Sequence, residues 1–195
     1  MPISLFFCYV REDEKLLKKL KTHLRPLQRQ GLIDVWYDRD IRAGTEWEPE
    51  IQHHLNAAQM VLLLISPDFM DSDYCYGVEM QRALERHGRG EATVIPIILR
   101  PAYWHGKPLG MLQALPTNGK PVTSSSWHDQ DTAFYDITHG IHTVVEQLMA
   151  QQTPTLPSAG EETRPEEALA RISAPLTQQG GKVSPSRAPL PAENL

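Results

Sequence analysis

The sequence predicts an α/β protein built on a five-stranded parallel sheet in the flavodoxin-like order 2-1-3-4-5, with helices on both faces. Two observations predict this class. Short apolar runs alternate about five times with stretches of helical spacing within the first 150 of the 195 residues. The apolar runs are also nearly continuous, which is typical of strands buried on both faces of a parallel sheet. Ligands of such sheets bind at the carboxyl ends of the strands.

The chain begins with a strand–helix–strand unit. Ile3–Tyr9 (ISLFFCY) is expected to form the first strand. Glu12–Gln30 carries leucines at helical spacing and is followed by Gly31, a typical residue after a helix, so a helix is predicted there. Leu32–Trp36 is expected to be the second strand, and the polar segment Tyr37–Glu46 a long loop.

The middle of the chain contains the predicted central strand. Trp47–Ala58 has the pattern of an amphipathic helix, and Met60–Ile65 (MVLLLI) is the most apolar run of the sequence. Ser66 and Pro67 are suited to the N-cap and first position of a helical turn. A further helix is predicted over Asp73–Arg86.

The last elements complete the sheet and close the domain. Thr93–Leu99 is expected to be a strand whose Pro96 favours an edge position, because proline cannot donate to a sheet ladder. Lys120–Thr123 is interpreted as a short last strand and Asp131–Met149 as the closing helix. The loops expected to surround a ligand are 9–13, 37–47, 66–76 and 100–110.

A change in composition predicts the end of the domain. Residues 1–150 contain all 14 aromatic side chains, whereas the last 45 residues contain 7 of the 16 prolines. Such a segment cannot bury enough apolar surface to offset its chain entropy. Residues 151–195 are therefore expected to be a Pro-rich disordered tail or linker.

Composition also excludes several classes of function. A formal net charge of −5 gives no reason to bind nucleic acid, and no apolar run approaches the roughly 18 residues of a membrane span. The N-terminus lacks the basic region and cleavage site of a signal peptide. Cys8 and Cys75 are too few for a disulfide framework or a four-cysteine zinc site, and we interpret them as buried thiols of a cytoplasmic protein.

The motifs of common cofactor sites are missing from the sequence. The turn after the first strand contains neither a dinucleotide-binding glycine motif nor a P-loop, and no nucleophile elbow occurs. The third strand ends Leu64-Ile65-Ser66-Pro67, without an aspartate that could accept a phosphoryl group. Adjacent histidines on a helix point about 100° apart, so the pair at 53–54 is a poor metal site. The sequence thus predicts no cofactor and no metal.

Seven segments together carry a resemblance. Leu5–Asp13 runs from an apolar strand into Tyr and acidic residues, and Trp36–Gly44 contains an Arg-Asp pair followed by a glycine. Ile65–Phe69 and Ser72–Cys75 lead into a helix that carries Glu79. Further matching segments are 93–100, 114–116 and 127–134. In this order and spacing they resemble a bacterial Toll/interleukin-1 receptor (TIR) domain over residues 3–148.

The sequence departs from the family pattern at three positions. Cys8 stands where serine is more usual, and Ala43 replaces the proline of the family's second box, which lies in its BB loop. Many enzymatic members have a tryptophan four residues before the catalytic glutamate. Here that residue is Cys75, and Tyr74, Tyr76 or Trp36 are candidates for the missing aromatic surface.

The resemblance implies two possible functions. Some TIR domains cleave the nicotinamide–ribose bond of NAD⁺ and release nicotinamide with ADP-ribose or a cyclic ADP-ribose isomer, and bacterial members often act in anti-phage defence or signalling. Others are adaptors that only assemble, through contacts such as those of the BB loop. Both imply TIR–TIR self-association, and the enzymatic members resemble one another in completing their pocket across two molecules. We expect the NAD⁺ nucleosidase, with NAD⁺ as substrate and no separate cofactor.

The chemistry of that reaction explains why one glutamate is sufficient. Breaking the N-glycosidic bond builds positive charge on the anomeric carbon, as in glycoside hydrolysis. Nicotinamide departs as a neutral molecule, so a general acid is not needed, and a carboxylate stabilises the developing cation. By its position in the resemblance, Glu79 is the candidate catalytic residue. The alternative is a solvent-facing Glu79 paired with Arg82, on a helix whose Val78 and Leu84 face the core.

The substrate-binding candidates surround the expected edge of the sheet. They are Tyr9, Val10, Arg11, Trp36, Asp40, Arg42, Cys75 and Tyr76. Each has an alternative interpretation: Arg11 as the partner of Glu14, Trp36 as a packing residue, and the two BB-loop charges as interface or solubility residues. Cys75 is expected to be part of the pocket wall, because no adjacent base activates it as a nucleophile.

Overall fold

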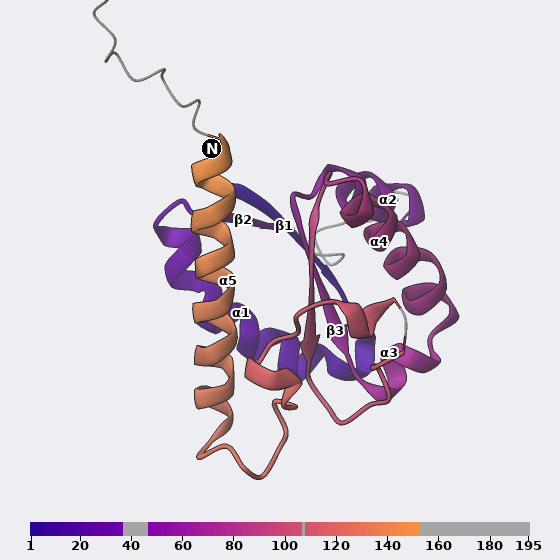
Figure 1. The fold of residues 1–195 in the computed structure, drawn as a ribbon, viewed down its shortest axis with the longest axis vertical. Helices are drawn as coiled ribbons and strands as arrows, with labels where there is room; N and C mark the ends of the chain where they lie inside the picture. Colours follow the sequence, from indigo (N-terminus) through magenta and orange to yellow (C-terminus); the bar gives the residue numbers. More distant parts are fainter. Residues whose placement is uncertain (37–46, 107, 153–195) are drawn as a thin grey trace, which may run out of the picture. The chain divides into compact units, whose positions relative to one another are not determined.

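A computed structural model describes residues 1–36, 47–106 and 108–152, and within them a parallel sheet lies between two layers of helices (Figure 1). The strands are β1 (Ile3–Cys8), β2 (Ile33–Trp36), β3 (Met60–Ile65) and β4 (Thr93–Ile98). Their order is β2-β1-β3-β4, and all neighbouring pairs are parallel. The predicted α/β class and the order 2-1-3-4 are therefore confirmed.

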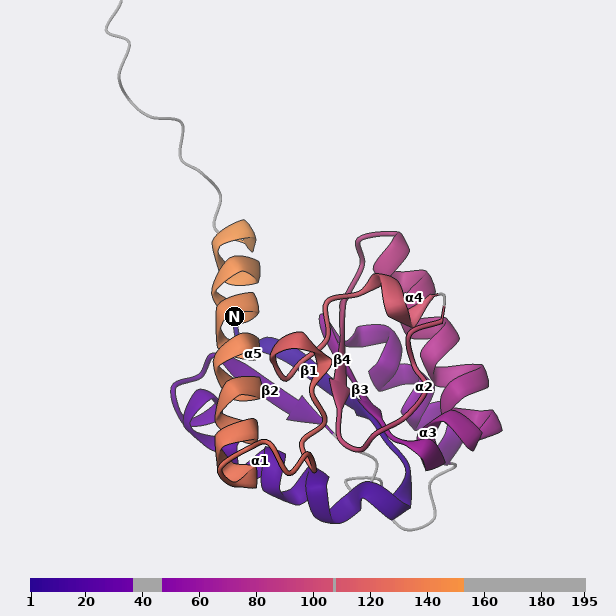
Figure 2. The same ribbon diagram turned by 60° about the horizontal axis from the view of Figure 1, so that its bottom comes forward.

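Each face of the sheet is covered by its own helices. Helices α1 (Glu14–Arg29) and α5 (Gln130–Gln152) pack on one face, as Figure 2 shows from a second direction. Helices α2 (Trp47–Ala57), α3 (Pro67–Asp71) and α4 (Met80–Gly88) pack on the other. Alternate strand residues contribute to the two apolar clusters, so both faces are buried, as the continuous apolar runs predict. None of the described helices is both long and apolar enough to cross a lipid bilayer.

The predicted fifth strand is replaced by a partial pairing. No strand is formed over Lys120–Thr123, although the N–H groups of Val122 and Thr123 donate to the carbonyls of Ile98 and Leu99. Pro121 lies inside this segment and has no N–H group, so the ladder cannot extend. Within the described residues, β4 is therefore the last strand at this edge of the sheet. On its outer side, the Pro96 carbonyl accepts a hydrogen bond from the Leu115 N–H at 2.8 Å.

The predicted helix over Asp73–Arg86 divides into two segments. The π-helical segment η3 (Asp73–Glu79) precedes α4, and the N–H of Met80 donates to the carbonyl of Cys75, five residues back. Because this turn holds more residues than an α-helical turn, it changes which side chains face the sheet. The prediction that Val78 faces the core is wrong: its side chain is 44 % exposed, whereas Glu79 is only 5 % exposed.

The other boundaries agree closely with the sequence. A 3-10 segment η1 (Arg11–Asp13) precedes α1, which ends just before Gly31, a residue with a positive φ of 69°. Ser66 caps α3 by accepting from the N–H of Phe69 at 3.1 Å, with Pro67 at the first helical position. The first two residues of the predicted tail, 151–152, belong to α5, so the domain boundary lies slightly later than predicted. The rest of the tail and the predicted loop over 37–46 lie outside the described residues.

Candidate active site

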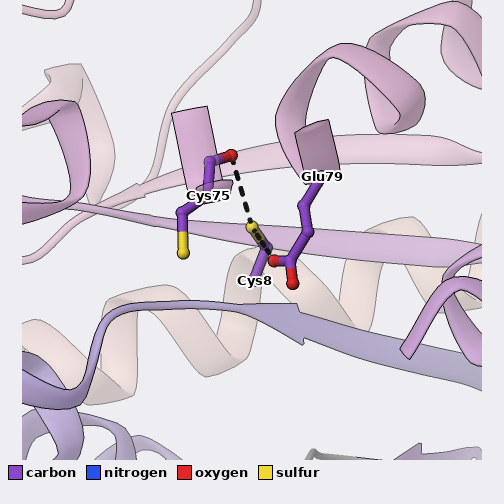
Figure 3. Close-up of side chains that lie close together, drawn as sticks. All are labelled: Cys8, Cys75 and Glu79. Atoms are coloured by element: carbon purple, nitrogen blue, oxygen red, sulfur yellow. Dashed lines mark hydrogen bonds between the residues drawn. The ribbon is translucent and has the colours of Figure 1, made fainter. Parts of the chain in front are cut away.

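Two thiols and a carboxylate meet at the carboxyl end of β1. Cys8 is the last residue of this strand, and its Sγ donates to Glu79 Oε2 at 2.7 Å. Cys75 and Glu79 both project from η3 toward the strand, as Figure 3 shows. All three side chains are buried. Glu79, the predicted catalytic residue, thus lies at the edge of the sheet where ligands of this fold class bind.

Backbone contacts of η3 explain this placement. The Ser72 hydroxyl accepts from the Cys75 N–H at 3.2 Å and so caps the first turn of the segment. The Cys75 thiol donates to the carbonyl of Tyr9 at 3.4 Å, and the Cys8 thiol lies 4.0 Å from the carbonyl of Cys75. Three contacts, including the one with Glu79, therefore join η3 to the end of β1.

Burial controls the charge state of the cluster. It raises the pKa of Cys8 well above the ordinary value of 9.0, and hydrogen bonding with Cys75 and the negative charge of Glu79 raise it further. Tyr74, the neighbour of Cys75, has a pKa raised to about 12, first by burial and then by the charge of Glu79. Cys8 is therefore a neutral thiol at neutral pH, and it serves Glu79 as a hydrogen-bond donor.

This burial predicts a loss of stability in alkaline solution. Above pH 9 the Cys8 thiol ionises in the unfolded chain but stays protonated in the native protein. The free energy of unfolding then falls by up to about 1.4 kcal/mol per pH unit, until the native thiol also ionises. Urea unfolding between pH 8 and pH 11 measures this slope. We expect a shallower slope for Cys8→Ser, and equal slopes would contradict the assignment.

A second polar cluster joins the ends of three strands. Asp13, only 1 % exposed, accepts from the Ser66 hydroxyl after β3 and from Arg100 Nε after β4, the latter at 2.8 Å. Arg100 also pairs with Asp68, and these two carboxylates raise its pKa. None of these residues is among the site residues predicted from the sequence. Its signal in the sequence is that Asp13 and Arg100 each lie within five residues of the end of a strand, at the same edge of the sheet.

The residues after β1 take different positions. The Tyr9 carbonyl accepts a hydrogen bond from the Cys75 thiol, and Val10 is buried in the apolar cluster that includes Cys8. Arg11 is exposed and forms no ion pair with another described residue. The alternative pairing of Arg11 with Glu14 is not formed, because Glu14 pairs with Lys18 at 3.0 Å.

The aromatic candidates Trp36 and Tyr76 come from two elements, β2 and η3. Trp36 stacks on Phe6 and on His54, with ring centroids 5.5 and 4.0 Å apart. Tyr76 is partly exposed and lines a hollow of about 150 Å³ with Tyr103 and Trp104. The two remaining candidates, Asp40 and Arg42, lie outside the described residues.

The alternative interpretation of Glu79 as a surface residue is excluded. Its side chain is buried, and Arg82, the expected partner, binds elsewhere. The Arg82 guanidinium pairs with Glu85 at 3.1 Å and donates to the side chain of Asn56 at 2.7 Å. Glu79 is therefore an acidic group held inside the protein. Burying a charge is costly unless it is paired and hydrogen-bonded, and such groups cluster at functional sites.

Comparisons with known proteins place the chain in a family. The model of the TIR domain family matches residues 5–133. The uncharacterized protein y4lF of Sinorhizobium fredii (strain NBRC 101917 / NGR234) is 41 % identical over 187 residues, which are 90 % of this chain. The match covers 57 % of that protein, so the chain spans little more than half of its length. The TIR domain of the Toll-related receptor TRR-2 from Hydra magnipapillata is 19 % identical, with a TM-score of 0.42 over 76 % of this chain and 95 % of that one.

Proposed function

The chain belongs to the TIR domain family, and from that premise we propose that it is an NAD⁺ nucleosidase whose catalytic residue is Glu79. One observation carries the proposal. The Glu79 carboxylate is held at the carboxyl end of β1 by an unusual π-helical turn, beside a thiol donor. Turns of this kind occur frequently at functional sites.

The proposed reaction needs little more than this carboxylate. The bond between the anomeric carbon and the nicotinamide nitrogen breaks, and its electron pair neutralises the nicotinamide. The Glu79 carboxylate faces the positive charge that develops on the ribose. Water then adds to the anomeric carbon and loses a proton, which gives ADP-ribose. If a nitrogen of the substrate's own adenine reaches this carbon instead, a cyclic isomer forms.

The hollow beside Tyr76, as the described residues line it, is too small to hold NAD⁺ by itself. The hollow beside Tyr76 measures about 150 Å³, below the roughly 300–1,000 Å³ of small-molecule sites. The family resemblance supports the further proposal that a second copy of the chain completes the pocket. The cellular role proposed with it is anti-phage defence or signalling.

The test is NAD⁺ consumption over a series of protein concentrations, with the products separated by chromatography. We expect nicotinamide release whose rate per molecule rises with protein concentration, because association completes the site. The chromatogram also distinguishes ADP-ribose from a cyclic isomer. A reaction rate per molecule that does not depend on concentration would contradict completion by a second copy, although not the activity itself.

The burial of Glu79 favours a second candidate function. A carboxylate only 5 % exposed is poorly placed to meet a substrate unless neighbouring groups move. The alternative is a non-enzymatic interaction module that assembles through TIR–TIR contacts of its BB loop. In that case no nicotinamide is released at any concentration, and self-association is unchanged by substitution of Glu79.

A further inference from the structure

The cluster at the end of β1 also has the composition of a metal site. The Sγ atoms of Cys8 and Cys75 and a carboxylate oxygen of Glu79 all lie within 4.8 Å of one another. Among the described residues, this is the one group of three such donors that are close enough to share an ion. We infer that Cys8, Cys75 and Glu79 bind a thiophilic divalent cation of the zinc class.

The distances suit a tetrahedral ion after a small adjustment. With Zn–S bonds of about 2.3 Å and Zn–O bonds of about 2.1 Å, neighbouring donors are roughly 3.6–3.8 Å apart. The cluster already lies within 4.8 Å, and the closest pair, Cys8 and Glu79, is 2.7 Å apart through its hydrogen bond. The ion replaces the proton of this bond, so the two side chains separate by about 1 Å.

The ligand atoms, two sulfurs and one oxygen, indicate which ion binds. Two sulfur ligands favour zinc-class ions over Mg²⁺ and Ca²⁺, which prefer oxygen ligands. Both thiols give up their protons to the solvent when the ion binds, and its two positive charges offset the cost of burying the thiolates. Three protein ligands leave a fourth position for water. Cys8 comes from β1 and the other two ligands from η3, so the ion joins two elements that are far apart in the sequence.

One consequence concerns the reaction and rests on the proposed function. An ion bound to a Glu79 oxygen offsets the negative charge that would stabilise the developing positive charge on the ribose. Binding of Zn²⁺ is therefore inhibitory, and removal of the ion by a chelator restores NAD⁺ cleavage. The binding itself does not depend on that activity.

Titration with Co²⁺ and Zn²⁺ tests the site directly. The chain is kept in a non-thiol reductant, so that a disulfide between the two cysteines does not form. Co²⁺ is expected to bind one per chain with a thiolate charge-transfer band, and Zn²⁺ to displace it. In Cys8→Ser and in Cys75→Ser the band is weakened and the affinity falls at least about a hundredfold, as expected for the loss of a ligand.

A control variant distinguishes the cluster from surface histidines. His142 and Glu146, 3.8 Å apart on α5, offer an exposed pair of possible ligands. His142→Gln is expected to leave the band and the affinity unchanged. Circular dichroism checks that the serine variants are folded. Because Cys8 and Cys75 are tested separately, misfolding of one variant leaves the other informative.

Two results would overturn the inference: Co²⁺ binding without a thiolate band, or equal affinity in wild type and in a folded serine variant. Inhibition by Zn²⁺ is measured separately, as the rate of nicotinamide release with and without a chelator. If the chain binds the ion but does not cleave NAD⁺, only the proposed function fails. If it cleaves NAD⁺ without binding the ion, only the metal site fails.

Discussion

Glu79→Gln is expected to reduce the release of nicotinamide from NAD⁺ by at least about a hundredfold. Glutamine has the same shape, and its amide oxygen still accepts from the Cys8 thiol, so the buried contact is retained. The negative charge is lost, however, and with it the stabilisation of the cationic transition state. The measurement is the rate of nicotinamide release at the highest protein concentration, where assembly is most complete.

Glu85→Gln is the matched control. Glu85 lies on α4, the helix that follows η3, but its side chain is exposed and pairs with Arg82. The same chemical change at this position is expected to leave the rate within about twofold, since surface ion pairs contribute little. Cleavage by folded Glu79→Gln at the wild-type rate would exclude Glu79 as the catalytic residue.

The second large effect concerns stability. Arg100→Leu is expected to lower the free energy of unfolding by about 2–3 kcal/mol, because it leaves the buried Asp13 carboxylate without its cation. The value lies below that of a fully buried pair, since the Arg100 side chain is 32 % exposed. In the native protein, Ser66 and Arg100 join Asp13 to the strand ends by hydrogen bonds. After the substitution only the bond from the Ser66 hydroxyl remains. Urea denaturation followed by circular dichroism measures the difference.

Asp68→Asn is the control for this cluster. It removes the other carboxylate that contacts Arg100, but the Asp68 side chain is 44 % exposed, whereas Asp13 is buried. The expected cost is below about 1 kcal/mol. Equal costs for the two substitutions would show that Asp13 gains little from its cation and that the cluster is only a surface network.

The strands could be predicted because burial on both faces of the sheet requires a continuous run of apolar residues in the sequence. Met60–Ile65 is apolar at every position, and all six of its side chains are buried. The fifth strand could not be predicted correctly from the apolar pattern, because its pairing depends on which N–H groups are available. Pro121 removes one of them.

The position of Glu79 could be predicted only through the family resemblance. The pattern around it favours an α-helix with Val78 inside, and no residue of the seven in η3 signals a wider turn. The contact between Cys8 and Glu79 joins residues 71 positions apart, and no local pattern predicts such a pair. The roles of Asp40 and Arg42 remain predictions, as do those of the other substrate-binding candidates.

The π-helical turn also makes the site sensitive to chain length. In an α-helix, successive residues are about 100° apart around the axis, so a deletion of one residue turns everything before it relative to everything after it. A π-helical turn, however, already holds one residue more than an α-helical turn, so removing Gly77 would let η3 close as an α-helix while the elements on both sides keep their directions. A single-codon deletion here would therefore preserve the fold but bring Cys75 and Glu79 from four residues apart to three, which shifts the thiol relative to the carboxylate without replacing either residue.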